Sequence, residues 1–322
     1  MENKPALTFI IPHREVENIA QTAAAVKASC EKTGVSYEIF SVSGNHPTKQ
    51  RNRCIERGRN AYIYFIDNDS VVTPNALEEF KKLLGENREF SVLAGPTLTP
   101  PSDTELQKNF NAVLTSFFTT GKMSARYMKK GAVRETDDSE IILCNLIIKK
   151  NVFTKHGLFN EKLYPNEENE FVYRIKSRGE KVIYDPEFCI FRSQRETLEK
   201  FIKQIFNYGR GRGEQTRVSP ESFKPSIMVP VLFSLYMVLF PLTVFFPADR
   251  AMLFSVPIYL YVFLDLMSWI TISLRDKKFY SYYPILFCIT HVMYGLGFIY
   301  GFFKKGFKAN EVDFKYQIEK VD

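Results

Sequence analysis

The chain has 322 residues, of which 45% are hydrophobic and 25% charged, and it carries a formal net charge of +7. These values suit one large folded domain or two modest ones, and they exclude a disordered chain, a collagen-like repeat and a small disulfide scaffold. A basic balance is compatible with nucleic acid, anionic lipid or phosphorylated substrates. Because the basic residues gather beside long apolar runs and no nucleic-acid-binding signature is present, we expect membrane lipids and no nucleic acid as partners.

The first two hundred residues alternate between strand and helix signals. Short apolar runs predict strands at 7–11, 37–42 and 61–66, with helices over 18–32 and 50–59. This alternation indicates βαβ units and a mainly parallel sheet, which binds ligands at the carboxyl ends of its strands.

Two carboxylates stand at the end of the third predicted strand, in the sequence Asp67-Asn68-Asp69. Such a pair can hold a divalent ion against a diphosphate, and oxygen ligands suit Mg²⁺ or Mn²⁺. The alternative is a simple turn, because Asp and Asn are favoured where strands end. Arg51, at the start of the preceding helix, can meet phosphate there or can be a surface ion-pairing residue.

A second acidic cluster opens a predicted helix at Glu167, Glu168 and Glu170, and basic residues close that helix before Gly179. Compensation of the helix dipole alone explains this layout. A carboxylate at the start of a helix, beside a metal-diphosphate site, can also act as the general base on an acceptor hydroxyl.

Three runs nearly free of charge follow, over 226–246, 251–274 and 282–303, each long enough to cross a bilayer. The basic residues around the first two runs place the N-terminal domain in the cytoplasm. A third crossing would put Lys304 and Lys305 outside, so whether the third run spans or is re-entrant stays open. Gly297 and Gly301 have the spacing of a close helix contact, or are chance glycines in an apolar run.

An amphipathic helix is predicted between the two regions. Its apolar residues are expected to face the membrane surface, although the same stripe could pack on the soluble domain. Gln204, Arg210 and Arg212 follow on this helix, where they can bind a diphosphate or anionic lipid. We therefore divide the chain into a catalytic domain (1–197), an interface helix and linker (198–225) and a membrane region (226–322).

These residues together resemble the membrane-anchored branch of the family 2 glycosyltransferases, and more narrowly the succinoglycan-type enzymes. The resemblance covers nearly the whole chain and rests on five stretches in the family's order: Phe9–Pro12, Asp67–Ser70, Gly157–Glu161, Glu167–Arg174 and Lys181–Pro186.

The resemblance implies a GT-A fold, a Rossmann-like sheet, and sugar transfer from a nucleotide donor with inversion. It makes Asp69 the metal ligand, aided by Asp67, which also touches the donor. Glu168 stands where the family commonly has an Asp base, with Glu167 as the rival. The family's first loop, which meets the nucleotide, corresponds here to Pro12, Arg14 and Glu15.

The chain also departs from the family. The acidic residue that often follows the second strand and contacts the nucleobase is missing, so a uridine donor does not follow. The Gln-x-x-Arg-Trp motif of processive synthases is missing as well, which disfavours a chain-extruding enzyme.

We therefore expect an inverting, metal-dependent glycosyltransferase of the cytoplasmic membrane, with its catalytic domain in the cytoplasm. It would move a sugar from a nucleoside-diphosphate sugar to a lipid-linked or polyprenyl-phosphate acceptor in polysaccharide or glycan assembly. A sugar nucleotidyltransferase is disfavoured because the loop after the first strand has no glycine. The remaining alternative is an inactive, membrane-anchored scaffold that binds nucleotide sugars.

Overall fold

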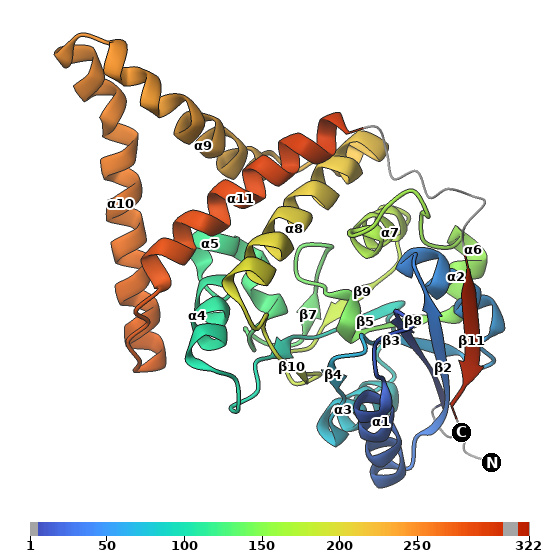
Figure 1. Ribbon diagram of the computed structural model, residues 1–322. Helices are drawn as coiled ribbons and strands as arrows, with labels where there is room; N and C mark the ends of the chain where they lie inside the picture. The colour runs from blue at the N-terminus through green and yellow to red at the C-terminus, as the bar shows by residue number, and fades with distance from the viewer. Residues whose placement is uncertain (1–5, 305–314, 322) are drawn as a thin grey trace. The chain divides into compact units, whose positions relative to one another are not determined.

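The computed structural model describes residues 6–304 and 315–321 and divides into two compact units (Figure 1). Unit 1 comprises Met1–Pro101, Ala125–Ser193 and Phe307–Asp322, and unit 2 comprises Ser102–Ser124 and Gln194–Gly306. The predicted division into 1–197, 198–225 and 226–322 stays a prediction, and these compact units are bounded differently: residues 194–225 also belong to unit 2. Residues 102–124 join the unit that holds the apolar helices, and the C-terminal tail joins the unit that holds the sheet.

Unit 1 is built on an eight-stranded mixed sheet of order β11-β2-β1-β3-β8-β5-β9-β7. Its pairs β2-β1, β1-β3 and β5-β9 are parallel, and the other neighbours run antiparallel. The strands are β1 (Ala6–His13), β2 (Ser36–Gly44), β3 (Tyr62–Phe65), β5 (Val92–Ala94), β7 (Arg134–Glu135), β8 (Leu146–Lys149), β9 (Val182–Tyr184) and β11 (Tyr316–Lys320). The predicted α/β class is confirmed, but the sheet is mixed instead of mainly parallel, because four of its seven strand pairs are antiparallel.

Helices cover both faces of this sheet because successive side chains of a strand point to opposite sides. Phe9 of β1 joins a core cluster that includes residues of α1 and α3, whereas Ile10 joins a second cluster that includes residues of α2, α6 and α7. The helices of unit 1 are α1 (Ala20–Thr33), α2 (Pro47–Arg57), α3 (Pro74–Gly85), α6 (Lys150–His156) and α7 (Glu167–Lys176). The strands and helices predicted for the first 66 residues are all confirmed.

A second, three-stranded sheet of order β4-β10-β6 lies in unit 1. It consists of β4 (Ser70–Val71), β6 (Thr97–Leu98) and β10 (Ile190–Arg192). β4 begins directly after Asp69, so this small sheet brings β10 to the end of β3.

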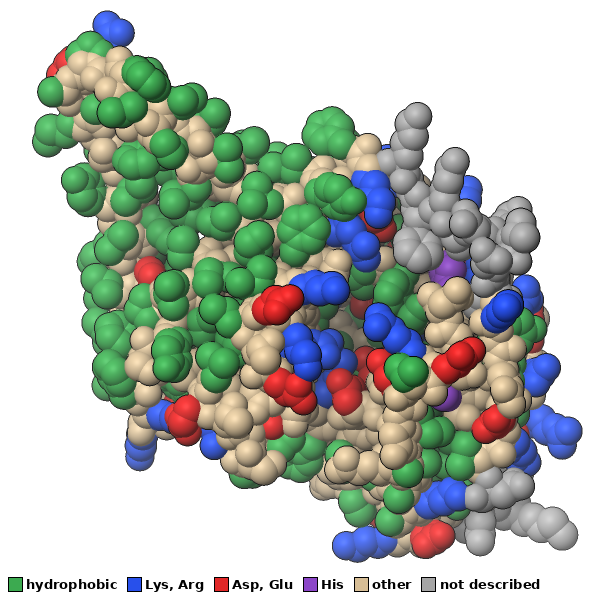
Figure 2. All heavy atoms as spheres, viewed as in Figure 1, with side chains coloured by type: hydrophobic (Ala, Val, Ile, Leu, Met, Phe, Trp, Pro, Cys, Tyr) green, Lys and Arg blue, Asp and Glu red, His purple; other side chains and the backbone are tan. Residues whose placement is uncertain are grey.

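Unit 2 is entirely helical among its described residues. Its helices are α4 (Glu105–Leu114), α5 (Phe117–Thr120), α8 (Leu198–Val218), α9 (Met228–Leu239), α10 (Ala248–Asp276) and α11 (Tyr283–Phe303), with short 3₁₀ turns between some of them. Three segments are long and apolar enough to cross a membrane: Pro225–Phe245, Ala248–Asp276 and Tyr283–Phe303. Figure 2 shows hydrophobic side chains gathered on the surface of α9 and α10.

The predicted interface helix is α8, and it continues to Val218. Two members of its apolar stripe are buried inside unit 2 instead of facing outward. Phe201 stacks on Phe110 of α4 with ring centroids 4.2 Å apart, and Ile205 is 2% exposed. Leu198, at the start of the stripe, is 40% exposed. The stripe therefore packs partly on protein, as the alternative interpretation allowed.

Candidate functional site

The site begins at the carboxyl edge of the parallel strands β1 and β3. Asp67, Asn68 and Asp69 form the turn between β3 and β4, closed by the Ser70 amide, which donates to the Asp67 carbonyl at 3.1 Å. The Thr22 hydroxyl of α1 donates to the carbonyl of Asn68 at 2.8 Å. The turn is thus held from both ends, and the two carboxylates project from a fixed backbone.

Arg192 binds both carboxylates of this turn. The pairing of β10 with β4 sets Arg192 opposite Ser70, beside the turn. Its Nε and Nη2 reach the two oxygens of Asp69 at 2.7 and 3.2 Å, and Nη2 also lies 3.1 Å from Asp67 Oδ2. Such forked contacts are the strong form of an arginine–carboxylate pair. Arg192 Nη1 lies 3.5 Å from the buried thiol of Cys144.

Arg51 of α2 holds the other side of Asp67. Its Nη2 contacts Asp67 Oδ1 at 3.1 Å, and its Nη1 contacts Glu167 Oε1 at 2.8 Å. The side chains of Arg51 and Glu167 are only 6% and 1% exposed. Burial raises the pKa of Glu167, and the Glu168 carboxylate raises it further, whereas Arg51 lowers it; the pKa of Glu167 lies at about 7.

The result is a line of alternating charges: Glu167, Arg51, Asp67, Arg192 and Asp69. Three carboxylates and two guanidinium groups leave an excess of one negative charge when all are ionised. Asp69 stands at the exposed end of the line, with 40% of its side chain accessible, and Glu167 stands at the buried end. The open end of the line is therefore the place where a cation or a charged ligand can be received.

Glu168 lies next to the line, in the first turn of α7. Its Oε1 accepts from the Asn169 amide at 3.0 Å, and the Asn169 carbonyl oxygen accepts from Arg126 Nη2 at 2.8 Å. Asn169 is fully buried and Glu168 is 9% exposed. Because Arg126 can only donate, it fixes which end of the Asn169 amide faces Glu168. Arg126 and Asn169 therefore orient the Glu168 carboxylate.

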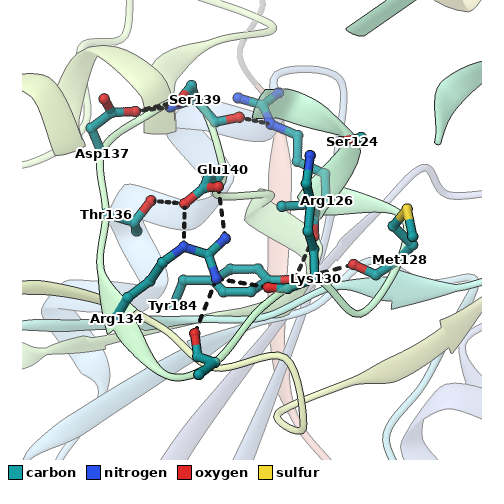
Figure 3. A network of polar contacts seen from close by, with 12 residues as sticks. Ser124, Arg126, Met128, Lys130, Arg134, Thr136, Asp137, Ser139, Glu140 and Tyr184 are labelled. Atoms are coloured by element: carbon teal, nitrogen blue, oxygen red, sulfur yellow. Dashed lines mark hydrogen bonds and ion pairs between the residues drawn. The ribbon is translucent and has the colours of Figure 1, made fainter. Parts of the chain in front are cut away.

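The loop that carries Arg126 is itself tied down by a polar network (Figure 3). Arg126 donates to the carbonyls of Ser139 and Asp138 at 2.9 and 2.7 Å. Farther along, Arg134 forms a forked pair with Glu140 and lies 4.4 Å from the centre of the Tyr184 ring. The network connects this loop to β9 and to α7, so Arg126 reaches Asn169 from a supported backbone.

The two carboxylates fit a divalent ion only as a partial ligand set. No group of three or more His, Cys, Asp or Glu side chains in the described parts of the chain could hold a metal ion. An ion here would take its remaining ligands from a bound diphosphate and water, which is the habit of Mg²⁺ at phosphate sites. Arg192 would have to yield at least one oxygen of Asp69. The pair thus suits an ion that arrives with its nucleotide.

The other predicted nucleotide residues lie at the end of β1. Pro12 is buried within the strand, and Arg14 and Glu15 are exposed just beyond it. β1 and β3 are parallel neighbours, so this loop and the Asp67 turn lie at the same edge of the sheet. A contact between these three residues and a nucleotide stays a prediction.

The predicted diphosphate or acceptor residues belong to α8 of unit 2. The Gln204 amide donates to the Tyr208 hydroxyl at 2.8 Å, and Arg210 lies 3.9 Å from Glu214. Arg212 is only 6% exposed and donates to Gln215 at 3.0 Å. Their proposed contact with the acceptor stays a prediction.

Sequence reasoning missed Arg192, Arg126 and Asn169. Arg192 and Arg126 stand at no recognisable spacing from the side chains that they contact, Asp69 and Asn169. Arg192 meets Asp69 across 123 positions, through the pairing of two strands of only two and three residues. The Asn169 side chain could have been singled out, because it directly follows Glu168.

Residues 15–155 match the family model described as glycosyl transferase family 2. Among solved structures, the chain resembles a mannosyltransferase from Pyrobaculum calidifontis in complex with GDP-mannose and Mn²⁺, at 10% identity and a TM-score of 0.58, covering 94% of this chain and 89% of that one. That likeness, together with the family match, shows a GT-A type fold.

Two weaker structural matches are residues 1–349 of Staphylococcus aureus TarS and a Drosophila β-1,4-galactosyltransferase 7 mutant with manganese, UDP-galactose and xylobiose. The first has 11% identity, a TM-score of 0.43 and coverage of 70% of this chain and 66% of that one. The second has 16% identity, a TM-score of 0.37 and coverage of 56% and 65%. A comparison with curated protein sequences found no match.

Proposed function

We propose that this chain is an inverting glycosyltransferase that takes a sugar from a nucleoside-diphosphate donor. The observation that carries the proposal is an oriented carboxylate, Glu168, directly after Glu167, which Arg51 links to the carboxylate pair at the end of β3. The family match over residues 15–155 covers that pair, and the GT-A type fold supports the same chemistry.

In this proposal Glu168 is the general base. It removes the proton from the acceptor hydroxyl as the oxygen attacks the anomeric carbon, on the face opposite the departing nucleotide. Asn169 and Arg126 keep the carboxylate aimed during the step. Glu167 is the weaker candidate for the general base. Its side chain is only 1% exposed and is paired with Arg51, so an acceptor hydroxyl has little access to it.

Asp69, with Asp67, would hold the divalent ion, Mg²⁺ or Mn²⁺. The ion would neutralise the negative charge that develops on the leaving diphosphate. The chain's own guanidinium group at Arg192 lies at the same place and contributes positive charge to the donor position. When a nucleotide binds, Arg192 can exchange its contact with Asp69 for a contact with a phosphate oxygen.

The acceptor in this proposal is a polyprenyl phosphate or another lipid-linked saccharide. The three apolar helices of unit 2 support a membrane anchor, and the basic residues of α8 suit a phosphorylated lipid headgroup. The catalytic unit then works on the cytoplasmic face, in polysaccharide or glycan assembly of the succinoglycan type.

A thermal-shift screen on detergent-purified protein tests donor binding. UDP-, GDP- and dTDP-sugars are compared with and without Mn²⁺, for the wild type and for Asp69→Asn. We expect one nucleotide class to stabilise the wild type in a metal-dependent way and to lose that effect in the variant. Equal stabilisation of both proteins would remove Asp69 from the metal site, and no shift with any donor would contradict donor binding.

The second candidate is an inactive, membrane-anchored scaffold that binds nucleotide sugars. One observation favours it: both oxygens of Asp69 are taken up by Arg192. Donor-induced stabilisation without metal, together with no turnover of any donor, would support this reading over catalysis.

A further inference from the structure

The last strand in the described part of the chain, β11, belongs to the same sheet as the first strand, β1. β11 pairs antiparallel with β2, so that Tyr316 lies opposite Gly44 and Lys320 opposite Phe40. Between these two strands the chain runs through all three apolar helices. A strand can join a sheet only on the side of the membrane where the sheet lies, so the number of crossings between β2 and β11 must be even.

The connection between α11 and β11 cannot supply an extra crossing. It is too short for a membrane helix, which needs about 20 apolar residues. It is also highly charged, with Lys304, Lys305, Lys308, Glu311, Asp313 and Lys315 among its residues. At least one of the three apolar helices therefore does not cross.

α11 differs from the other two apolar helices in how much of it is covered. In its most apolar 18-residue window 39% of the segment is buried inside the protein, compared with 11% in each of the other two. A larger share of its side chains at that window thus packs on protein than in the other two helices. Because the number of membrane crossings between β2 and β11 is even, α11 is the apolar helix that does not cross the membrane.

The cover on α11 is α8, and the two helices run side by side (Figure 1). A Cβ added at Gly297 or Gly301 would collide with the backbone carbonyl of Phe206 or Arg210, and one added at Gly209 would collide with that of Tyr294. The contacts advance in the same direction along both helices, so the helices are parallel.

This stretch of α8 carries charges that could not accompany α11 through a bilayer. Arg210, Arg212, Glu214 and Arg217 lie in it, and the Arg217 guanidinium donates to the carbonyl of Lys304 at the end of α11. A charged side chain at the centre of a bilayer is strongly unfavourable. Since α8 stays outside the bilayer core and packs on the second half of α11, that half of α11 lies outside the core as well.

The beginning of α11 also contacts the short helices α4 and α5 of unit 2. The Tyr282 amide donates to Asn109 of α4 at 3.1 Å, and His291 Nε2 lies 3.3 Å from the carbonyl of Phe118 in α5. On its outer side α11 exposes apolar side chains, with Ile285 62% and Phe303 77% accessible. One face is thus on protein and the other is suited to lipid.

We infer that α11 lies along the membrane surface on the side of the sheet, and that the chain crosses the bilayer twice, through a hairpin of α9 and α10. The inference rests on the membrane anchor of the proposed function. It leaves Lys224, Lys277 and Lys304 on the inner side, with Asp249 and Arg250 at the outer tip of the hairpin. This distribution satisfies the positive-inside rule, which three crossings would violate at Lys304.

Single cysteines in the full-length chain test this topology. Glu56→Cys marks the sheet, Arg250→Cys the tip of the hairpin and Glu319→Cys the tail, at positions that are exposed. Each is treated with a membrane-impermeant maleimide on intact cells and on inside-out vesicles. The parent chain, with four buried cysteines and one half-buried, measures background labelling.

We expect Glu56→Cys and Glu319→Cys to react only in inside-out vesicles, and Arg250→Cys only in intact cells. Labelling of Glu319→Cys from outside would mean three crossings and would overturn the inference. An Arg250→Cys that does not react from outside would overturn the two-crossing hairpin. Extraction of each membrane with alkaline carbonate tests membrane insertion independently of topology. Release of the parent chain would show that it is not inserted in the membrane, and would overturn the inference as well.

Discussion

The ion pair between Arg51 and Glu167 offers a stability test of the site, because both side chains are almost fully enclosed. Replacing Arg51 with Met leaves the Glu167 carboxylate buried without its partner. Breaking a buried pair in this way costs about 3 to 5 kcal/mol while the carboxylate stays ionised. The comparison is therefore made at about pH 9, above the pKa of about 7 that Glu167 has in the intact pair. Asp67 adds little to the cost, because it is 25% exposed and keeps Arg192. At roughly 2 to 4 °C per kcal/mol for a unit of this size, Tm should fall by about 6 to 20 °C.

Arg53 on the same helix is the matched control. It pairs with Glu56 at 3.4 Å, and the two side chains are 43% and 51% exposed. Arg53→Met removes an exposed pair, which is worth at most about 0.5 kcal/mol within a helix, so Tm should change by no more than about 2 °C. The double variant Arg51→Met/Glu167→Gln should recover part of the loss, because no unpaired carboxylate remains.

A thiol-reactive fluorogenic dye measures this unfolding in detergent, because the four cysteines of unit 1 are buried in the folded protein and exposed on unfolding. The four are Cys30, Cys54, Cys144 and Cys189. A Tm of Arg51→Met within about 2 °C of that of the Arg53→Met control would contradict the buried ion pair. It would also contradict the line of charges at its buried end, where Arg51 meets Glu167.

Four further outcomes follow from the site. Glu168→Gln should lower kcat by about 10²- to 10⁴-fold while the donor still shifts Tm, whereas Glu170→Gln, as a control on the same helix turn, should keep kcat within about 10-fold. Asn169→Leu should lower kcat and alter its pH profile with KM nearly unchanged; an unaltered profile would argue against its orienting role. Asp69→Asn should abolish Mn²⁺-dependent donor binding in calorimetry. Arg192→Gln should tighten Mn²⁺ binding to the nucleotide-free protein several-fold by electron paramagnetic resonance, and a weaker affinity would show that Arg192 does not compete with the ion.

The edge of the sheet could be predicted because local patterns determine it. Short apolar runs followed by polar turns indicate where β1 and β3 end, and Asp67 and Asp69 directly follow the second of these strands. The helix that opens at Glu167 was equally readable, from acidic residues at its start and basic residues at its end. These signals need only neighbours along the chain.

The partners of those carboxylates depend on long-range pairing, which spacing does not reveal. Two roles are open for Arg51 from the sequence, a contact with phosphate near a helix start or an ion pair at the surface. In the structure its side chain is buried and forms ion pairs with Asp67 and Glu167. Arg192 arrives through the β4–β10 pairing. The β11 strand joins the far edge of the sheet, and its five residues carry no signal for the strand that they contact.

Transfer of a labelled sugar tests whether the chain is a glycosyltransferase with Glu168 as its general base. Purified wild type and Glu168→Gln are incubated with a panel of radiolabelled nucleoside-diphosphate sugars, Mn²⁺ and polyprenyl phosphate in lipid vesicles, and label in the lipid fraction is counted. We expect one donor to label the lipid with the wild type, and we expect the variant to lose at least about 99% of this label. Equal labelling by both proteins would contradict the role of Glu168, and no labelling from any donor would contradict the transferase itself.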